Sequence, residues 1–281
     1  MISRSVKALL GWERRTKREK DVLAHRLRRA VARAISLLPV PLWVLLRAFG
    51  SDKHRPGLHG YGFTYHALFR PLKYRRIKLL EIGIGGYGTS LGGQSLLAWQ
   101  AFFPFGDIVA ADIAPKRELT GGRAHIRVLD QSSAEDLTVL CAADGPFDIA
   151  IDDGSHMNAH QIFTFQHLWD SVKDGGIYVV EDIQTSFWAG EVDGVHWDGA
   201  PIDDPAFSRT CAGYFLELAK YTSHAEFLDL SHADPALLAI GRTVREIAFS
   251  HNLIVIRKGA NDGGSPLAKA HRAAAVANRS Q

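Results

Sequence analysis

A mostly parallel, seven-stranded sheet with helices on both faces is the fold that this sequence predicts. From Lys78 onward, seven short apolar runs alternate with segments of helical periodicity, which is typical of α/β domains. Four of the first five runs end in glycine or an acidic residue, and the remaining one has Asp112 as its next-to-last residue. In open sheets of this kind ligands bind beyond the carboxyl ends of the strands, so the residues at these ends are the candidate functional residues.

The strands and helices follow from these runs in chain order. The expected strands lie at 78–85, 107–113, 125–130, 147–153, 176–182, 225–230 and 252–258. The helices expected from an apolar stripe at helical spacing lie at 92–103, 133–143, 160–172 and 205–221. Because no internal repeat is seen, we assign residues 51–258 to one domain, with a basic helical extension at 1–50 and a flexible C-terminal tail at 259–281.

Composition excludes several classes of protein. The 281 residues are 46% hydrophobic and 22% charged, as in ordinary globular proteins. Cys141 and Cys211 are the two cysteines and form no CxxC motif, which argues against a disulfide framework or a zinc site. The apolar stretch at 34–46 contains two prolines and is too short to span a bilayer. We expect a cytoplasmic protein without a signal peptide.

The extension at 1–50 is strongly basic, with 12 Lys and Arg against 3 acidic residues, whereas the remainder has 21 against 27. Between Val22 and Leu38 apolar and basic residues occupy opposite sides of an expected helix. The apolar positions are Leu23, Leu27, Val31, Ala34 and Leu38, and the basic ones are Arg26, Arg29 and Arg33.

Two interpretations of this helix stay open. Residues 1–46 could dock on the inner, anionic face of a membrane as a peripheral contact. Alternatively, the helix packs its apolar side on the main domain or on a second subunit of a homo-oligomer. Nucleic acid is not an expected partner, because the acidic remainder would repel phosphate.

The first strand ends in a glycine-rich turn that could bind a nucleotide cofactor. Gly83, Gly85 and Gly88 fit the pattern GxGxxG, and glycines let the backbone approach a ligand closely. Asp112 ends the second strand, where it could accept hydrogen bonds from a ribose. Glu81 lies inside the first strand, and the segment TSLGGQS delays the next helix. Since a dinucleotide pyrophosphate needs that helix start, we favour S-adenosylmethionine over NAD.

The third strand ends in Asp130 and Gln131, which are candidates for contacts on the adenine side of the cofactor. The alternative is that these residues form a turn followed by a helix cap at Ser132 or Ser133.

Acidic residues end both the fourth and the fifth strand. Asp153, Glu181 and Asp182 should converge, because neighbouring strands lie about 4.8 Å apart. Clustered carboxylates repel one another unless a cation lies among them, and Mg²⁺ prefers oxygen ligands. We predict that these three residues bind Mg²⁺, with Mn²⁺ as a possible substitute, and give Asp152 a structural role. The alternative is that the acids only cap helices and bond to loop amides.

His156 follows Asp153 by three residues on the turn that leaves the fourth strand. Histidine suits proton transfer near neutral pH, so His156 is the candidate general base. Together with Asp153 it makes up the predicted catalytic pair. His160 and His167 are interpreted as helix residues.

Several motifs, taken together, resemble the macrocin and mycinamicin group of metal-dependent sugar O-methyltransferases. The motifs are SDKHRPGLHGYGFTY, LLEIGIGGYG with GGQSLLAWQAFFP, DQS, GPFDIAIDDGSHMNAH and GGIYVVEDIQTSFW, within about residues 51–190. The resemblance implies a Rossmann-like class I methyltransferase fold, S-adenosylmethionine as methyl donor, Mg²⁺ on Asp153, Glu181 and Asp182, and His156 as base. Phe187 departs from the tyrosine that relatives often carry, and the basic extension lies outside the shared core.

The predicted function is therefore Mg²⁺-dependent O-methylation of a sugar hydroxyl on a glycoside, polysaccharide or glycolipid, in natural-product or cell-envelope glycan biosynthesis. Three alternatives remain. An NAD-dependent oxidoreductase is favoured by GxGxxG and Asp112, and a non-catalytic membrane-docked binding protein by the N-terminal helix alone. The third is a metal-dependent methyltransferase of a catechol-like hydroxyl. A hydride transfer would not need three clustered carboxylates. The segment from Gln184 to Pro205 is a candidate lid over the acceptor.

Overall fold

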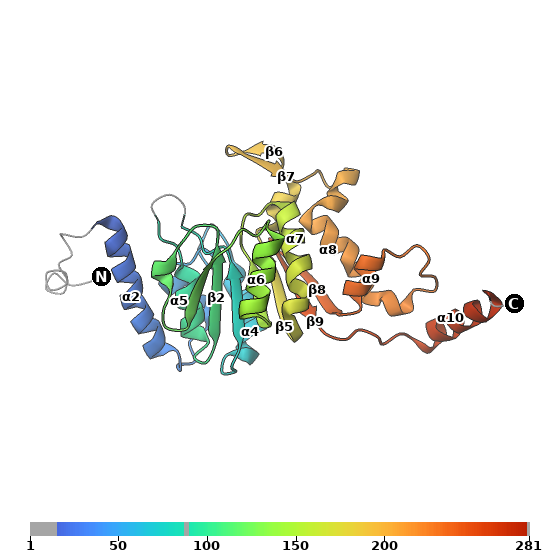
Figure 1. The fold of residues 1–281 in the computed structure, drawn as a ribbon, viewed down its shortest axis with the longest axis horizontal. Coiled ribbons are helices and arrows are strands. Elements are labelled where there is room, and N and C mark those ends of the chain that lie inside the picture. Colours follow the sequence, from blue (N-terminus) through green and yellow to red (C-terminus); the bar gives the residue numbers. More distant parts are fainter. Residues whose placement is uncertain (1–15, 87–89, 280–281) are drawn as a thin grey trace. The chain divides into compact units, whose positions relative to one another are not determined.

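A computed structural model describes residues 16–86 and 90–279, with side chains as far as residue 274. The chain divides into two compact units, Met1–Asp130 and Gln131–Gln281. The main sheet has seven strands in the order β3-β2-β1-β4-β5-β9-β8 (Figure 1). The predicted α/β class, with a mostly parallel sheet flanked by helices, is confirmed.

Three parallel strands form the sheet of the first unit. They are β1 (Lys78–Ile82), β2 (Asp107–Asp112) and β3 (Ala124–Val128). Every residue of β1 and β2 after the first is buried, as expected of strands that are covered on both faces. The register places Ile82 beside Ala111, so that β1 and β2 end at the same edge.

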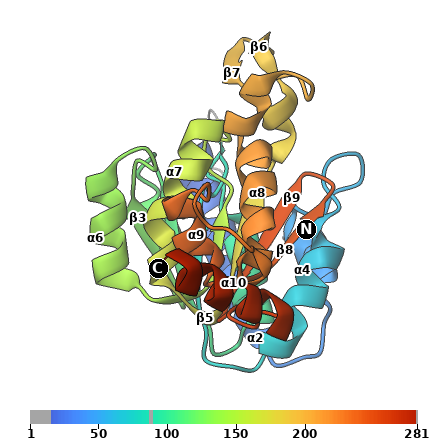
Figure 2. The same ribbon diagram turned by 90° about the vertical axis from the view of Figure 1, so that its right-hand side faces the viewer.

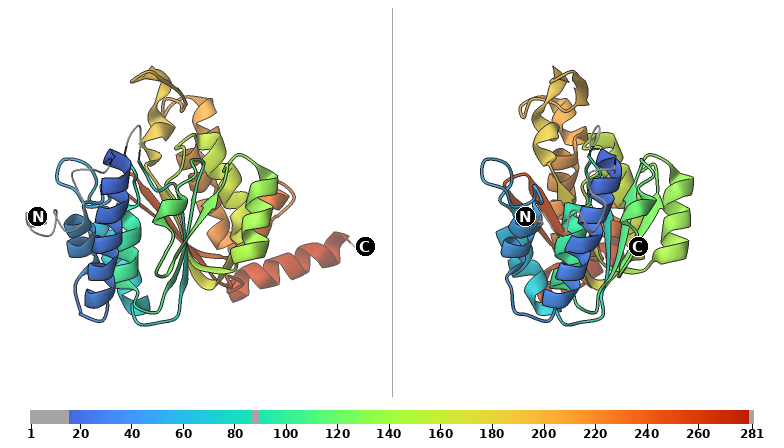
Figure 3. Two further views of the ribbon diagram at one scale, coloured as in Figure 1. Left: turned by 60° about the vertical axis from the view of Figure 1, so that its left-hand side comes forward. Right: turned by 90° about the vertical axis from the view of Figure 1, so that its left-hand side faces the viewer.

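The helices of the first unit lie mostly before the sheet in sequence. They are α2 (Lys17–Ile35), α3 (Leu42–Phe49), α4 (Tyr61–Phe69) and α5 (Gln94–Phe102). All of α5 after Gln94 is buried, and both α2 and α3 pack against it (Figure 3). Helix α2 begins with a capping box, in which Thr16 and Glu19 satisfy each other's backbone amides.

The face that α2 turns to its own unit is polar as well as apolar. His25 and Ala32 are buried, and the Arg29 guanidinium donates hydrogen bonds to the carbonyl oxygens of Leu119 and Thr120. The predicted apolar stripe lies largely on the other side, since Leu27 and Val31 are 39% and 53% exposed. The helix was therefore predictable, but the face that packs on the unit was not.

The second unit contributes four strands to the sheet. Strands β4 (Phe147–Asp152) and β5 (Val172–Glu181) are parallel, whereas β9 (Leu253–Lys258) runs antiparallel to β5 and β8 (Val244–Ser250) antiparallel to β9. Its helices are α6 (Ala134–Asp144), α7 (Asn158–Leu168), α8 (Cys211–Lys220), α9 (Pro235–Gly241) and α10 (Pro266–Arg279) (Figure 2).

One predicted strand is wrong. Residues 225–230 form no strand: the 3₁₀ helix η7 (Tyr221–Glu226) ends within them and the rest is irregular. The strand of this region is β8, which is the last strand of the sheet and is mostly exposed. An exposed edge strand carries polar residues instead of an apolar run, so β8 lacked the signal that revealed the buried strands.

Two further segments differ in detail from the expectations. The candidate lid contains a two-stranded hairpin of β6 (Ala189–Val192) and β7 (Val195–Asp198). Helix α10 lies in the segment predicted as a tail. In the part of the chain that the structure describes, no helix is long and apolar enough to cross a membrane.

Candidate active site

The turn that follows β4 carries Asp153 and His156, as the sequence predicted. His156 adopts a left-handed backbone conformation with φ of 58°. Non-glycine residues rarely adopt this conformation, and it costs free energy that the surrounding structure must supply. The turn leads into α7, whose N-cap residue is Met157.

The segment that follows β5 carries Glu181 and Asp182. Asp182 is also left-handed, with φ of 55°, and precedes the 3₁₀ helix η5 (Ile183–Phe187). Thus two predicted site residues, one after each of two adjacent parallel strands, have strained backbones. Such strain is typical of functional sites.

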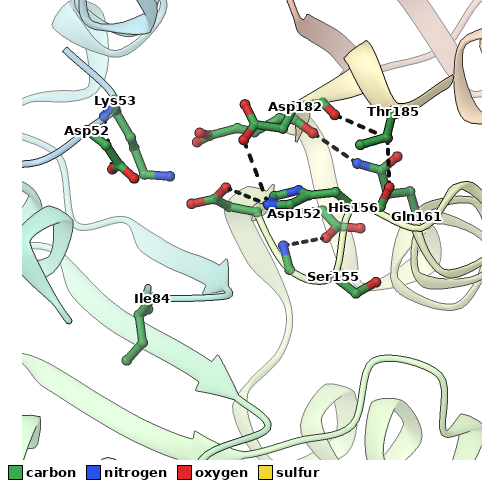
Figure 4. A network of polar contacts seen from close by, with 12 residues as sticks. Asp52, Lys53, Ile84, Asp152, Ser155, His156, Gln161, Asp182 and Thr185 are labelled. Atoms are coloured by element: carbon green, nitrogen blue, oxygen red, sulfur yellow. Dashed lines mark hydrogen bonds and ion pairs between the residues drawn. The ribbon is translucent and has the colours of Figure 1, made fainter. Parts of the chain in front are cut away.

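The two segments bring Asp153, His156 and Asp182 together, and Figure 4 shows His156 beside Asp182. One ligand atom from each of these residues lies within 4.8 Å of those of the other two. The His156 Nε2 atom is 3.9 Å from Asp153 Oδ1 and 3.7 Å from Asp182 Oδ2. Glu181, the third predicted metal ligand, is not in this group of three, and its side chain is buried.

Three hydrogen bonds tie the two segments to each other, and Figure 4 shows those of Thr185 and Gln161. Thr185 Oγ1 donates to the His156 carbonyl oxygen at 2.7 Å, and Gln161 Nε2 donates to the Glu181 carbonyl oxygen at 2.9 Å. Asn158 Nδ2 donates to the Thr185 carbonyl oxygen at 3.4 Å. These bonds stabilise the strained turns, and sequence reasoning missed the three donors. The motifs that contain Asn158 and Thr185 were the available signals.

Beneath the turn, Asp152 and Gln131 form a buried polar network. The Gln131 amide donates to Asp152 and to Thr164, and its oxygen accepts from the Ser155 backbone. Burial raises the pKa of Asp152 to about 7, although the Gly154 amide, His156 and Gln131 oppose this shift. The Gln131 side chain, predicted to contact adenine, thus serves protein groups. Asp152 supports the turn, in keeping with its predicted structural role.

In the first unit, the predicted ribose contact Asp112 lies against the glycine-rich turn. Its carboxylate accepts from the Ile84 backbone at 3.1 Å and from Lys116 Nζ at 2.8 Å. Gly83 and Gly85 are left-handed, with φ of 78° and 64°, so glycine is the residue that permits this turn without strain. Lys116 Nζ also donates to the Gly85 carbonyl oxygen. The third glycine of the pattern, Gly88, lies outside the described residues.

Glu81 lies in the core of the first unit. It accepts hydrogen bonds from Ser95 Oγ at 2.8 Å and Trp99 Nε1 at 3.0 Å, and Lys53 Nζ lies 3.3 Å from its other oxygen. Lys53 and Glu81 are 2% and 0% exposed. These contacts connect β1 to α5 and to the segment before α4. Asp130 is the last residue of this unit.

Comparison with known proteins identifies relatives of this chain. Residues 80–183 match the family model described as a methyltransferase domain. The 8-demethyl-8-alpha-L-rhamnosyl tetracenomycin-C 2'-O-methyltransferase of Streptomyces olivaceus is 38% identical over 225 residues, which cover 80% of this chain and 56% of that protein. The mycinamicin VI 2''-O-methyltransferase of Micromonospora griseorubida is 36% identical over 211 residues, which cover 74% of this chain and 51% of that protein.

The chain is a homologue of the macrocin and mycinamicin group of sugar O-methyltransferases. A solved structure of the mycinamycin-pathway methyltransferase MycE, in complex with Mg and SAH, agrees with this assignment. It matches with a TM-score of 0.72 and 34% identity, over 80% of this chain and 56% of that one. The class I methyltransferase fold expected from the resemblance is confirmed. The present chain spans about half the length of the curated relatives that it matches, namely 56% and 51% of the two proteins named above.

Proposed function

We propose that this chain is an S-adenosylmethionine- and Mg²⁺-dependent O-methyltransferase that acts on a sugar hydroxyl of a glycoside, polysaccharide or glycolipid. The observation that carries the proposal is the convergence of Asp153, His156 and Asp182 on two strained turns after β4 and β5. The names of the relatives support the reaction and the sugar acceptor. The Mg and SAH in the MycE structure support the two cofactors.

The donor set fits a hard divalent cation. Asp153 and Asp182 offer carboxylate oxygens within 4.8 Å of each other, and Glu181 precedes Asp182 directly. Oxygen donors are the ligands that Mg²⁺ and Mn²⁺ prefer. We assign Asp153, Glu181 and Asp182 to the metal. Bound there, Mg²⁺ would supply a Lewis acid for the acceptor hydroxyl.

We assign to His156 the role of general base, which accepts the proton of that hydroxyl. Its Nε2 atom faces both carboxylates, at 3.7 and 3.9 Å. The ring therefore lies beside the proposed metal ligands, where a general base for the acceptor hydroxyl is needed. The hydrogen bond from Thr185 to the His156 carbonyl oxygen holds the backbone of His156 in place.

All but one of the proposed cofactor residues belong to the first unit, and Gln131 is the first residue of the second. Gly83 and Gly85 allow a ligand close to the backbone, and Asp112 remains the candidate for the ribose hydroxyls. Glu81 would act from inside the core, by holding the strand that leads into the turn. Asp130 stays proposed for the adenine side, and Gln131 is proposed there through its backbone only, because its side chain serves Asp152, Thr164 and Ser155.

The test combines binding with catalysis. Calorimetry with S-adenosylhomocysteine and with NAD should show binding of the first alone. Mass spectrometry of candidate glycosides after reaction should show the gain of one CH₂ unit, which chelation abolishes and added Mg²⁺ or Mn²⁺ restores. Full methylation in excess chelator would contradict the metal assignment, and methylation of catechols alone would contradict the sugar assignment.

For localisation, we propose a cytoplasmic enzyme with a peripheral membrane contact through residues 1–46. The support is the exposure of Leu37 and Leu38, 64% and 52%, at the end of a helix whose Arg26 and Arg33 are exposed. Co-sedimentation with anionic vesicles should fall when both leucines are replaced by Asp. Unchanged co-sedimentation would refute the membrane contact, and a concentration-dependent mass that those same replacements lower would indicate a homo-oligomer instead.

A further inference from the structure

Helix α7 begins without a cap of its own. Its N-cap residue is Met157, whose side chain makes no capping hydrogen bond. The first backbone amides of a helix have no partner inside the helix and need an acceptor from elsewhere. This helix start directly follows His156, so its anchoring bears on the candidate active site.

Asp198 supplies the missing cap from 40 residues away. Its Oδ1 accepts from the Asn158 backbone amide and its Oδ2 from the Ala159 amide, both at 2.9 Å. The Asn158 side-chain amide donates to the same Oδ1, also at 2.9 Å. A carboxylate here also complements the positive end of the helix dipole.

The cap belongs to the β6–β7 hairpin, since Asp198 is the last residue of β7. Two backbone bonds seat this end of the hairpin, from Gly199 to the Trp188 carbonyl and from Ala200 to the Ser186 carbonyl, at 2.9 and 3.1 Å. A Cβ at Gly199 would overlap the Thr185 and Trp188 carbonyl oxygens, so this close approach requires glycine.

Asn158 then links the cap to the rest of the site. Its side-chain oxygen accepts from Ser186 Oγ at 2.7 Å and from the Cys211 backbone amide at 2.8 Å. Its amide nitrogen bridges Asp198 and the Thr185 carbonyl. The hairpin, η5 and the starts of α7 and α8 therefore meet at one buried side chain, which is 1% exposed.

We propose that Asp198 is a positioning residue for catalysis: by capping α7 it joins the β6–β7 hairpin to the turn that carries Asp153 and His156 and holds that turn in its active geometry. Burial opposes ionisation of Asp198, but the hydrogen bonds from Ala159 and Asn158 outweigh it and hold the pKa of the carboxyl below its usual range. The cap is thus charged at neutral pH. The role in catalysis rests on the proposed function, whereas the role in shaping the metal site does not.

The chain offers a matched control in Asp234. This residue caps α9 in the same unit and accepts from the Ala236 and Leu237 amides at 2.8 and 3.0 Å. Replacing Asp234 removes a cap of the same chemistry away from the candidate site. Any effect that both replacements share is then an effect of helix capping on stability alone.

The experiment makes three measurements on the full chain: thermal unfolding, turnover, and Mn²⁺ affinity from the electron paramagnetic resonance signal of free Mn²⁺. The variants are Asp198→Ala, Asp198→Asn, Asp234→Ala and Asp234→Asn. Asp198→Ala should lower both Mn²⁺ affinity and kcat by about 2- to 30-fold, the range that corresponds to a lost N-cap. KM for S-adenosylmethionine should stay unchanged. Asp198→Asn keeps an acceptor oxygen and should show a smaller loss. The Asp234 variants should lower the melting temperature alone.

Wild-type Mn²⁺ affinity and kcat in Asp198→Ala, with a loss of stability equal to that of Asp234→Ala, would overturn the proposal. If Asp198→Ala does not fold, Asp198→Asn decides by the same two measurements. A wild-type chain that methylates no glycoside would refute the proposed function, and Mn²⁺ affinity would still test Asp198.

Discussion

His25 of the first unit and His156 of the second are both largely buried, and their surroundings have opposite charge. His25 is 6% exposed, and its pKa falls to about 4, first because of burial and then because Arg29 and Arg28 are near. His156 faces the carboxylates of Asp153 and Asp182 instead. Burial alone therefore does not indicate a catalytic histidine. The two histidines differ in the sign of the neighbouring charges, and only His156 lies beside carboxylates.

The comparison is tested most strongly at His156. His156→Ala should fold and bind cofactor, and its kcat should fall by about 10²- to 10⁴-fold, the usual contribution of a general base. His160, which contacts Ser155 Oγ at 2.9 Å, provides the control because it lies outside the carboxylate group. Steady-state kinetics should leave His160→Ala near wild type. Equal rates for the wild type and His156→Ala would remove His156 from the mechanism.

The buried ion pair of the first unit should matter for stability more than any exposed pair. Lys53→Met leaves the Glu81 carboxylate buried without its lysine, and loss of one partner of a buried pair costs about 3–5 kcal/mol. Chemical denaturation measures this loss in the free energy of unfolding. Lys173→Met breaks a partly exposed pair with Asp148 and is the control, with a loss of about 0–1 kcal/mol. Equal losses would show that burial of the Lys53–Glu81 pair contributes little to the free energy of unfolding.

The lowered pKa of His25 predicts that the folded chain loses stability in acid. Its pKa in the folded chain, about 4, lies below the ordinary value of 6.5. As the pH falls, the unfolded chain takes up this proton first, so the stability is complete above pH 6.5 and declines towards pH 4. The decline should reach about 3 kcal/mol.

The test compares the free energy of unfolding across this range in the wild type, His25→Phe and the exposed-site control His232→Gln. His25→Phe should have a shallower slope, and His232→Gln the wild-type slope. Identical slopes in the wild type and His25→Phe would contradict the buried, neutral state of His25.

The smallest effect is expected at Arg18. It pairs with Glu118 at 2.7 Å, and the two side chains are 64% and 35% exposed. Salt bridges of this kind contribute about 0.2–1 kcal/mol and weaken as salt rises. Arg18→Ala should lower the melting temperature slightly at low salt and not at high salt. A large loss at high salt would mean that Arg18 anchors α2 by packing.

The sequence by itself determined the α/β class and the residues at the strand ends. Strands buried on both faces must be continuous apolar runs, and ligand residues of such a sheet must lie where those runs stop. That reasoning placed Asp153, His156, Glu181 and Asp182 in one site, and the structure groups all of them except Glu181. It failed at β8, because an exposed edge strand has no apolar run to reveal it.

Only the tertiary structure decided which groups hold the site in shape. The cap of α7 comes from Asp198, and the His156 carbonyl is held by Thr185, 29 residues further along the chain. The face of α2 that packs was likewise set by carbonyl oxygens of a turn about 90 residues away, which accept from Arg29. Local periodicity indicates which side chains share a face of a helix or strand. Hydrogen bonds between distant segments depend on which segments the tertiary fold brings together.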